Sequence, residues 1–205
     1  MAMNKYSEPQ SSVAGLLLAG GEGRRMGGAD KGLMPWLGVP MAHRIFSELG
    51  KVVTPVLISA NRNLEEYRRL APDRVFSDGE AFRGQGPLAG LHRGLVEAGH
   101  LGARALLVCP CDTPDISAQV FSLLLEAWQA EPEHPVLAES EGRVHPLHAI
   151  YPVSCAQLLE QQLRQGNRRV MVFADMAGAR RLVCDQASGA FRNRNYPEDL
   201  RDGSS

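Results

Sequence analysis

Short runs of apolar residues alternate with longer stretches of helical spacing along most of the chain. Residues 13–19 form a continuous apolar run that ends at Gly20 and Gly21, which predicts a strand buried on both faces. The other runs that we interpret as strands are 52–59, 74–76, 104–109, 135–139, 147–151 and 180–184. Apolar residues at helical spacing predict helices at 41–50, 64–70, 87–98, 118–130, 154–164 and 169–176.

Two local signals sharpen these boundaries. Ser117 stands immediately before the amphipathic stretch 118–130, where serine is a favoured N-cap residue. The pair Glu141-Gly142 separates two of the predicted strands and suits a tight turn between them. We therefore expect these two strands to pair with each other.

The alternation of strands and helices predicts a three-layer α/β fold with a mostly parallel central sheet. We expect one domain over residues 13–200, with flexible tails at 1–12 and 201–205. In such sheets, ligands bind beyond the carboxyl ends of the strands. The loops after Ala19 and Cys109 would both lie at that edge, so the search for a site begins there.

Composition excludes several classes of protein. The 205 residues contain 22 Lys and Arg against 23 Asp and Glu, and this balance argues against nucleic-acid binding. The polar N-terminal segment lacks the apolar stretch of a secretory signal, and the first apolar run is too short to cross a membrane. The four cysteines are too few for a disulfide framework. We expect a cytoplasmic protein.

The loop that follows the first predicted strand is rich in glycine and positive charge. Residues 18–31 contain five glycines together with Arg24, Arg25 and Lys31. Glycines let a backbone approach a polyphosphate, and the cations can neutralise it. The loop matches neither G-x-G-x-x-G, because Met26 stands at the last glycine position, nor the Walker A pattern. A solvated surface turn is the alternative, but the position after a buried strand favours phosphate binding.

Asp112 follows the predicted strand 104–109 in the stretch Cys-Pro-Cys-Asp-Thr-Pro. Mg²⁺ usually takes one or two carboxylates together with substrate phosphates and waters, so one aspartate at this edge suffices for a nucleotide-bound ion. The alternative is an Asp-Thr-Pro turn in which Asp112 caps the next helix. We interpret Cys109 as a strand core residue and Cys111 as a loop packing residue, because no second cysteine pair completes a zinc site.

The stretch LLLAGGEGRRMGGADKGLMPWLGVPM (16–41) resembles the signature of the molybdenum cofactor guanylyltransferases, the MobA family. This family belongs to the Rossmann-like nucleotidyltransferases, whose loop follows L-x-A-G-G-x-x-x-R-M-G-x-x-K. The resemblance covers nearly the whole chain, and CPCDTP, RRVMVF and the final N-x-N are its more specific parts. It continues through SANR (59–62), SDGE (77–80), GPLAGL (86–91), CPCDTP (109–114), HPLHA (145–149), RRVMVF (168–173) and FRNRNYPEDL (191–200).

The resemblance implies a three-layer α/β/α nucleotidyltransferase fold and a set of site residues. Lys31, Arg25 and Asp112 would be catalytic, and Asp112 would also bind Mg²⁺. The nucleotide would be held by backbone N–H groups of 18–21, and the pterin by two arginines and two asparagines of the C-terminal half. The implied nucleotide-binding residues are Leu18, Ala19, Gly20, Gly21, Lys31, Asn61, Asp78, Gly86 and Asp112, and the implied pterin-binding residues are Arg168, Arg169, Asn193 and Asn195.

The implied reaction is the transfer of GMP from GTP to the phosphate of molybdopterin, with release of pyrophosphate. One alternative is a cytidylyltransferase acting on the same pterin, and another is a non-catalytic GTP-binding protein that delivers the cofactor. We expect a monomer that makes transient contact with other cofactor-biosynthesis proteins and recipient molybdoenzymes. The roles of Arg83, His145 and His148 stay open. The two histidines lie three residues apart in a β-like stretch, so we do not expect them to share a face.

Overall fold

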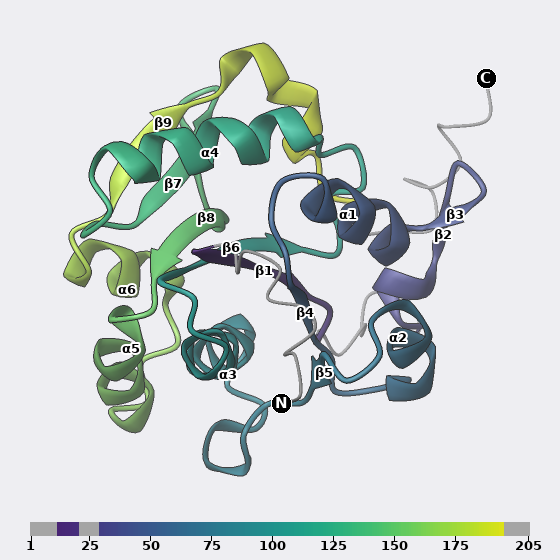
Figure 1. Cartoon of the computed structure of the whole chain (residues 1–205), viewed down its shortest axis with the longest axis horizontal. Coiled ribbons are helices and arrows are strands. Elements are labelled where there is room, and N and C mark those ends of the chain that lie inside the picture. The colour runs from purple at the N-terminus through teal and green to yellow at the C-terminus, as the bar shows by residue number, and fades with distance from the viewer. Residues whose placement is uncertain (1–11, 21–28, 195–205) are drawn as a thin grey trace, which may run out of the picture.

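The computed structural model describes residues 12–20 and 29–194. Within them a seven-stranded sheet forms the central layer, with helices on both faces (Figure 1). Its strands, in spatial order, are β5 (Val75–Phe76), β4 (Val56–Ser59), β1 (Val13–Leu18), β6 (Ala105–Pro110), β8 (Arg143–Pro152), β7 (Val136–Ser140) and β9 (Arg180–Val183). The helices are α1 (Met41–Gly50), α2 (Leu64–Leu70), α3 (Pro87–His100), α4 (Ala118–Ala130), α5 (Cys155–Arg164) and α6 (Val170–Met176).

The first half of the chain builds the parallel part of the sheet. β1 lies between β4 and β6 and is parallel to both, and β5 extends the sheet beyond β4. Leu18 pairs with Ser59 on one side and with Pro110 on the other, so these strands end together. Their carboxyl ends therefore form one edge, which confirms the predicted location of the site loops. β8 is the antiparallel strand of the sheet, paired with both β6 and β7.

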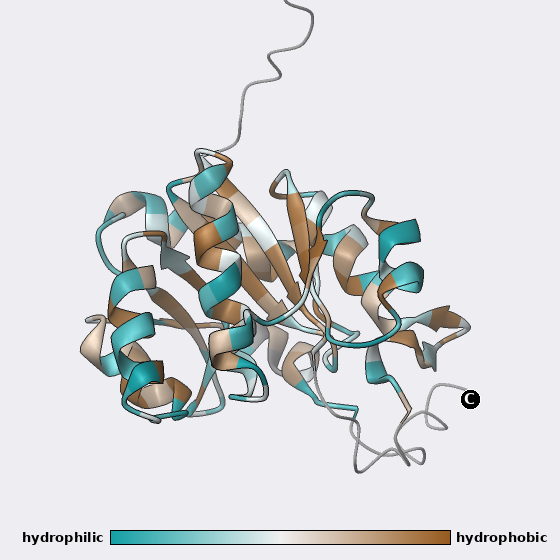
Figure 2. Ribbon diagram, turned by 90° about the horizontal axis from the view of Figure 1, so that it is seen from below, coloured by the Kyte–Doolittle hydropathy of each residue, from teal (hydrophilic) through white to brown (hydrophobic). Residues whose placement is uncertain are grey.

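Two hydrophobic clusters fill the spaces between the layers. One gathers the inner sides of α1, α2 and α4, and the other gathers those of α3, α5 and α6. The strands are hydrophobic and the outer sides of the helices are hydrophilic (Figure 2). Gly94 lets α3 lie close to the sheet, because a Cβ at this position would be only 2.6 Å from Leu16 Cδ2. The three-layer α/β prediction is confirmed.

The observed boundaries differ from the predicted ones in a few places. β4 begins at Val56, not at residue 52, because the N–H groups of Val52 and Val53 both donate to the Leu49 carbonyl and prolong the end of α1. β8 starts directly after the predicted turn, where Glu141 and Gly142 have φ of 51° and 72°. This two-residue hairpin extends the strand further than its apolar pattern indicated.

Within the described residues, the sequence patterns missed a small hairpin and three 3₁₀ turns. The hairpin pairs β2 (Pro35–Trp36) with β3 (Val39–Pro40) outside the main sheet. The turns are η2 (Lys31–Leu33), η3 (Glu80–Phe82) and η4 (Asp185–Phe191). In the described ranges, no helix is both long and apolar enough to span a membrane.

Candidate nucleotidyltransferase site

Asn61 and Asp78, predicted from the loops after two different strands, bind each other at the carboxyl edge. Asn61 Nδ2 donates to Asp78 Oδ2 at 2.9 Å, and its Oδ1 accepts from the Asp78 N–H at 3.0 Å. The same Nδ2 lies 3.3 Å from the Gly20 carbonyl oxygen. The structure thus brings together three predicted nucleotide residues from the loops after β1, β4 and β5.

Asp78 is a buried carboxylate in this group. Burial raises the pKa of Asp78, while the hydrogen bonds from Asn61 and the Gly84 backbone and the charge of Arg83 oppose that rise. The positive charge of Arg83, a residue whose role the sequence left open, therefore acts on this carboxylate. Gly86 follows at the start of α3 with φ of 76°, a conformation that favours glycine.

The backbone of 18–21, which we expect to hold the nucleotide, is partly engaged within the protein. The backbone N–H of Ala19 donates to the Ser59 carbonyl at 2.7 Å, and the Leu18 carbonyl accepts from the Cys111 N–H at 3.0 Å. The Ala19 N–H is therefore committed to the sheet and is not offered to a phosphate, because a buried strand must pair its own backbone groups. Gly21, Arg24 and Arg25 lie outside the described residues.

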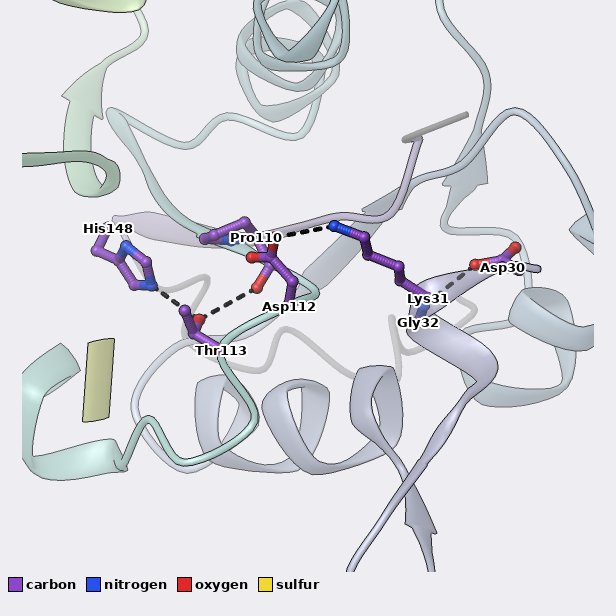
Figure 3. Close-up of polar contacts among 7 residues, drawn as sticks. All are labelled: Asp30, Lys31, Gly32, Pro110, Asp112, Thr113 and His148. Carbon is purple, nitrogen blue, oxygen red and sulfur yellow. Dashed lines mark hydrogen bonds and ion pairs between the residues drawn. The ribbon is translucent and has the colours of Figure 1, made fainter. Parts of the chain in front are cut away.

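Lys31 and Asp112 meet across the edge of the sheet. Lys31 Nζ lies 3.5 Å from Asp112 Oδ2, and the two side chains are 24% and 19% exposed (Figure 3). Lys31 comes from η2, before α1, and Asp112 from the loop after β6. A cation and a carboxylate from distant segments thus share one partly exposed position.

Asp30 fixes the backbone next to Lys31. Its carboxylate accepts from the Gly32 N–H at 3.2 Å, from the Tyr67 hydroxyl at 2.7 Å and from Asn63 Nδ2 at 3.1 Å. Gly32 is needed here because a Cβ would collide with the Tyr67 hydroxyl. Sequence reasoning missed Asp30, although an acidic residue directly before the site lysine was an available signal.

The alternative that Asp112 caps the next helix is wrong. The N-cap residue of α4 is Ser117, as predicted, but its side chain makes no cap hydrogen bond. Instead Glu48 Oε2 accepts from the Ala118 N–H at 2.8 Å. A carboxylate from α1 thus does the capping, and Asp112 stays at the sheet edge beside Lys31.

The donor set at Asp112 fits a nucleotide-bound Mg²⁺ and not a protein-only metal cage. Among the residues described, no three His, Cys, Asp or Glu side chains are grouped as metal ligands. Cys109 and Cys111 are buried, as predicted, and burial raises the pKa of both thiols. One partly exposed carboxylate at the carboxyl edge of the sheet is compatible with the ion's preference for few protein oxygens and several from substrate and water.

His148 supports the residue that follows Asp112. Its Nε2 lies 2.8 Å from Thr113 Oγ1, and both side chains are buried (Figure 3). Burial, with a smaller contribution from the nearby His145, lowers the pKa of His148 to about 3, so the ring is neutral.

The expectation that the two histidines would not share a face is wrong. Their ring centroids are 5.7 Å apart, and Phe191 stacks on His145 at 4.5 Å. The reason is a register shift between β7 and β8, where Leu137 pairs with Ala149 but Ala138 pairs with His145. This bulge breaks the strict alternation of side chains along β8.

The predicted pterin residues lie on two separate segments. Arg168 and Arg169 are exposed, and Arg169 is the N-cap residue of α6. Asn193 is exposed and follows η4, while Asn195 lies outside the described residues. In the described part of the chain, no hydrogen bond or ion pair joins Asn193 to either arginine. The next residue, Arg194, donates its backbone N–H to the Asp112 carbonyl at 2.8 Å and so links this segment to the Asp112 loop.

Comparison with known proteins gives a consistent result. The sequence profile of the MobA-like NTP transferase domain matches residues 15–179. The molybdenum cofactor guanylyltransferase of Cereibacter sphaeroides is 40% identical over 186 residues, covering 91% of this chain and 92% of that protein. The enzyme of the same name from Serratia proteamaculans (strain 568) is 37% identical over 188 residues, covering 91% of each chain.

A solved structure supports the fold. The molybdopterin-guanine dinucleotide biosynthesis protein A from Archaeoglobus fulgidus superposes with a TM-score of 0.73 at 22% identity, covering 93% of this chain and 96% of that one. Edge geometry, profile and full-length sequence similarity agree: the chain belongs to the molybdenum cofactor guanylyltransferases, a family of nucleotidyltransferases with a MobA-like NTP transferase domain.

Proposed function

We propose that this nucleotidyltransferase moves GMP from GTP to the phosphate of molybdopterin through the edge that carries Lys31 and Asp112. The observation that carries the proposal is the pairing of these two side chains, 3.5 Å apart, at the sheet edge that also carries the Asn61–Asp78 group. Four loops at the carboxyl edge of the parallel strands thereby present a cation, two carboxylates and an amide. The similarity to enzymes named molybdenum cofactor guanylyltransferase supports the choice of guanine and of the pterin.

The chemistry asks for positioning and charge neutralisation more than for acid–base catalysis. The attacking phosphate oxygen of the pterin is already anionic near neutral pH, so it needs no strong general base. Lys31, together with Arg25, would neutralise the triphosphate and the departing pyrophosphate. Asn61 and Asp78 would hold the nucleoside, helped by Gly86 and by the backbone at Gly20 and 21. Gly20 suits this role because a Cβ there would lie 3.0 Å from Asn61 Nδ2.

Asp112 would hold the Mg²⁺ ion of the bound nucleotide. The ion, when bound, supplies charge stabilisation to the phosphate oxygens. Asp112, through the ion, and Lys31 would then act on the same phosphates. Lys31 also offsets the negative charge of Asp112. Arg168, Arg169, Asn193 and Asn195 would bind the pterin phosphate and the amide-like pterin edge. The N-terminal half is thus the nucleotide half and the C-terminal half the pterin half.

The decisive assay is pyrophosphate release from GTP, CTP, ATP and UTP in turn, with Mg²⁺ and molybdopterin-loaded carrier present. We expect release from GTP that depends on the pterin. Asp112→Asn keeps the size of the side chain but removes its charge, so release should fall by about 100-fold or more. Asp73→Asn is the matched control: Asp73 is exposed, precedes β5 at the far end of the sheet, and has φ of 60°, which asparagine tolerates.

Each contrary outcome points to a different reading. Release from CTP instead of GTP would replace the guanylyltransferase with a cytidylyltransferase. GTP binding without any pyrophosphate release would favour the non-catalytic delivery protein. Near-normal release by Asp112→Asn would remove Asp112 from the metal site. The cytoplasmic location, the monomeric state and the transient contacts with other proteins of the pathway stay predictions.

A further inference from the structure

Three segments that each carry a candidate site residue meet in one side-chain cluster, Trp36–Asp115–Arg194. Trp36 lies on the β2–β3 hairpin just after Lys31, Asp115 follows Asp112 in the same loop, and Arg194 follows Asn193. Trp36 Nε1 donates to Asp115 Oδ1 at 2.7 Å, and Arg194 Nη2 donates to Asp115 Oδ2 at 2.8 Å. The Arg194 guanidinium carbon lies 4.1 Å from the centre of the Trp36 ring, which closes the triangle.

Of the two charged side chains in the cluster, Arg194 is more deeply buried than Asp115. It is 7% exposed, and its Nε and Nη1 atoms have no hydrogen-bond partner among the residues that the structure describes. Among the described residues, the Asp115 carboxylate and the Trp36 ring face balance this charge. A buried cation that loses its one carboxylate is costly, so the cluster holds together as a unit.

The cluster reaches the reaction edge through the backbone. The Arg194 N–H donates to the Asp112 carbonyl at 2.8 Å, so fixing the Arg194 side chain also fixes the residue that carries the candidate metal ligand. Asp115 anchors the same loop from its other end. We propose that Arg194 is a positioning residue that, through Asp115 and Trp36, holds the Asp112 loop against the segment of Asn193.

The catalytic consequence of this role rests on the proposed function, whereas its structural consequence, the positioning of the Asp112 loop, does not. A misplaced Asp112 loop should lower the rate of transfer more than the binding of GTP, because Asn61, Asp78 and Lys31 remain in place. Small displacements at a reacting centre cost about 10- to 100-fold in rate. The expected kinetic signature is therefore a lower kcat with a nearly unchanged KM for GTP.

The test compares Arg194→Met, Asp115→Asn and the double variant with Arg180→Met in the full chain. Arg180 is a matched control, since it also ties a C-terminal strand to another element: it donates to the Ala127 carbonyl at 2.9 Å and pairs with Glu131 at the far end of α4. Amide hydrogen exchange of residues 111–117 is measured without ligands, and kcat and KM are measured by pyrophosphate release.

Arg194→Met and Asp115→Asn should each speed loop exchange by about tenfold beyond any change in global stability, and the double variant should add little, as expected for a contacting pair. Both should lower kcat by about 10-fold or more, and Arg194→Lys, which keeps the ion pair, should recover part of it. Equal effects of Arg194→Met and Arg180→Met on loop exchange would overturn the proposal. A wild-type chain without transferase activity would refute the proposed function instead, and the exchange measurement would still decide the role of Arg194.

Discussion

Acidification should weaken folding through His148, a buried histidine at the support of the Asp112 loop. Its ring is neutral, bonds to Thr113 Oγ1 at 2.8 Å and is 3% exposed. Burial lowers the pKa of His148 from 6.5 to about 3 in the folded chain. In the unfolded chain the ring takes up a proton below pH 6.5, whereas the folded chain does not. Stability is therefore complete above pH 6.5 and is lost as the pH falls from 6.5 toward 3.

The size of this effect follows from the two pKa values. Within the range between these pKa values, each pH unit below 6.5 lowers the free energy of unfolding by about 1.4 kcal/mol. At pH 5 this one histidine should therefore lower it by about 2 kcal/mol. His145 and His92 contribute in the same direction, because burial also lowers the pKa of each. A comparison of variants is needed to isolate the share of His148.

Urea unfolding at pH 7.5 and at pH 5.0 measures this share directly. In His148→Gln the difference between the two pH values should be smaller than in the wild type by about 2 kcal/mol. The loss of the ring itself cancels, because each protein is compared with itself. His100→Gln is the control, since His100 has a 71% exposed side chain and should leave the difference unchanged. Parallel losses in the wild type and in His148→Gln would refute the assignment of a neutral, buried ring.

Three other predictions test the edge and its support. Gly94→Ala should lower the free energy of unfolding by about 1–3 kcal/mol in urea titration, because the new Cβ would lie 2.6 Å from Leu16 Cδ2; an unchanged midpoint would mean that α3 shifts freely. Lys31→Met should lower kcat/KM for GTP-dependent pyrophosphate release by about 100-fold with an unchanged circular dichroism spectrum, and a small effect would place the triphosphate elsewhere. Burial raises the pKa of Asp78, so Asp78→Asn, which can still accept from Asn61, should raise the Tm at pH 7.5, with a gain that shrinks as the pH falls. A lower Tm at pH 7.5 would contradict the buried-charge argument.

Local pattern was sufficient for most elements and for the edge at which the loops of the candidate site lie. Continuous apolar runs predicted β1 and β6, because a strand covered by helices on both faces has no polar side. Helical spacing predicted α1, α2 and α4 with their observed bounds, since one face of each packs on the sheet. The resemblance to a family then supplied the proposed nucleotide-binding roles of Asn61 and Asp78, which spacing alone would have assigned to a turn and a cap.

Local pattern failed where the conformation depends on a partner in another element. The cap of α4 comes from Glu48 and not from the expected serine, because the tertiary fold brings α1 against the start of α4. The bulge that turns His148 toward Thr113 depends on how β7 and β8 pair, which neither strand's own sequence reveals. The first error concerns a hydrogen bond between residues 70 positions apart, and the second concerns the register of two strands that a two-residue turn joins.

By itself, the sequence determined the order of strands and helices and the edge at which the glycine-rich loop and Asp112 would lie, because periodicity and strand ends are local properties. Only the tertiary structure decided which side chains meet there. The ion pair of Lys31 with Asp112 and that of Asp115 with Arg194 join residues that are far apart in the chain. Such contacts are set by how loops converge after the sheet has assembled, and no local pattern encodes that convergence.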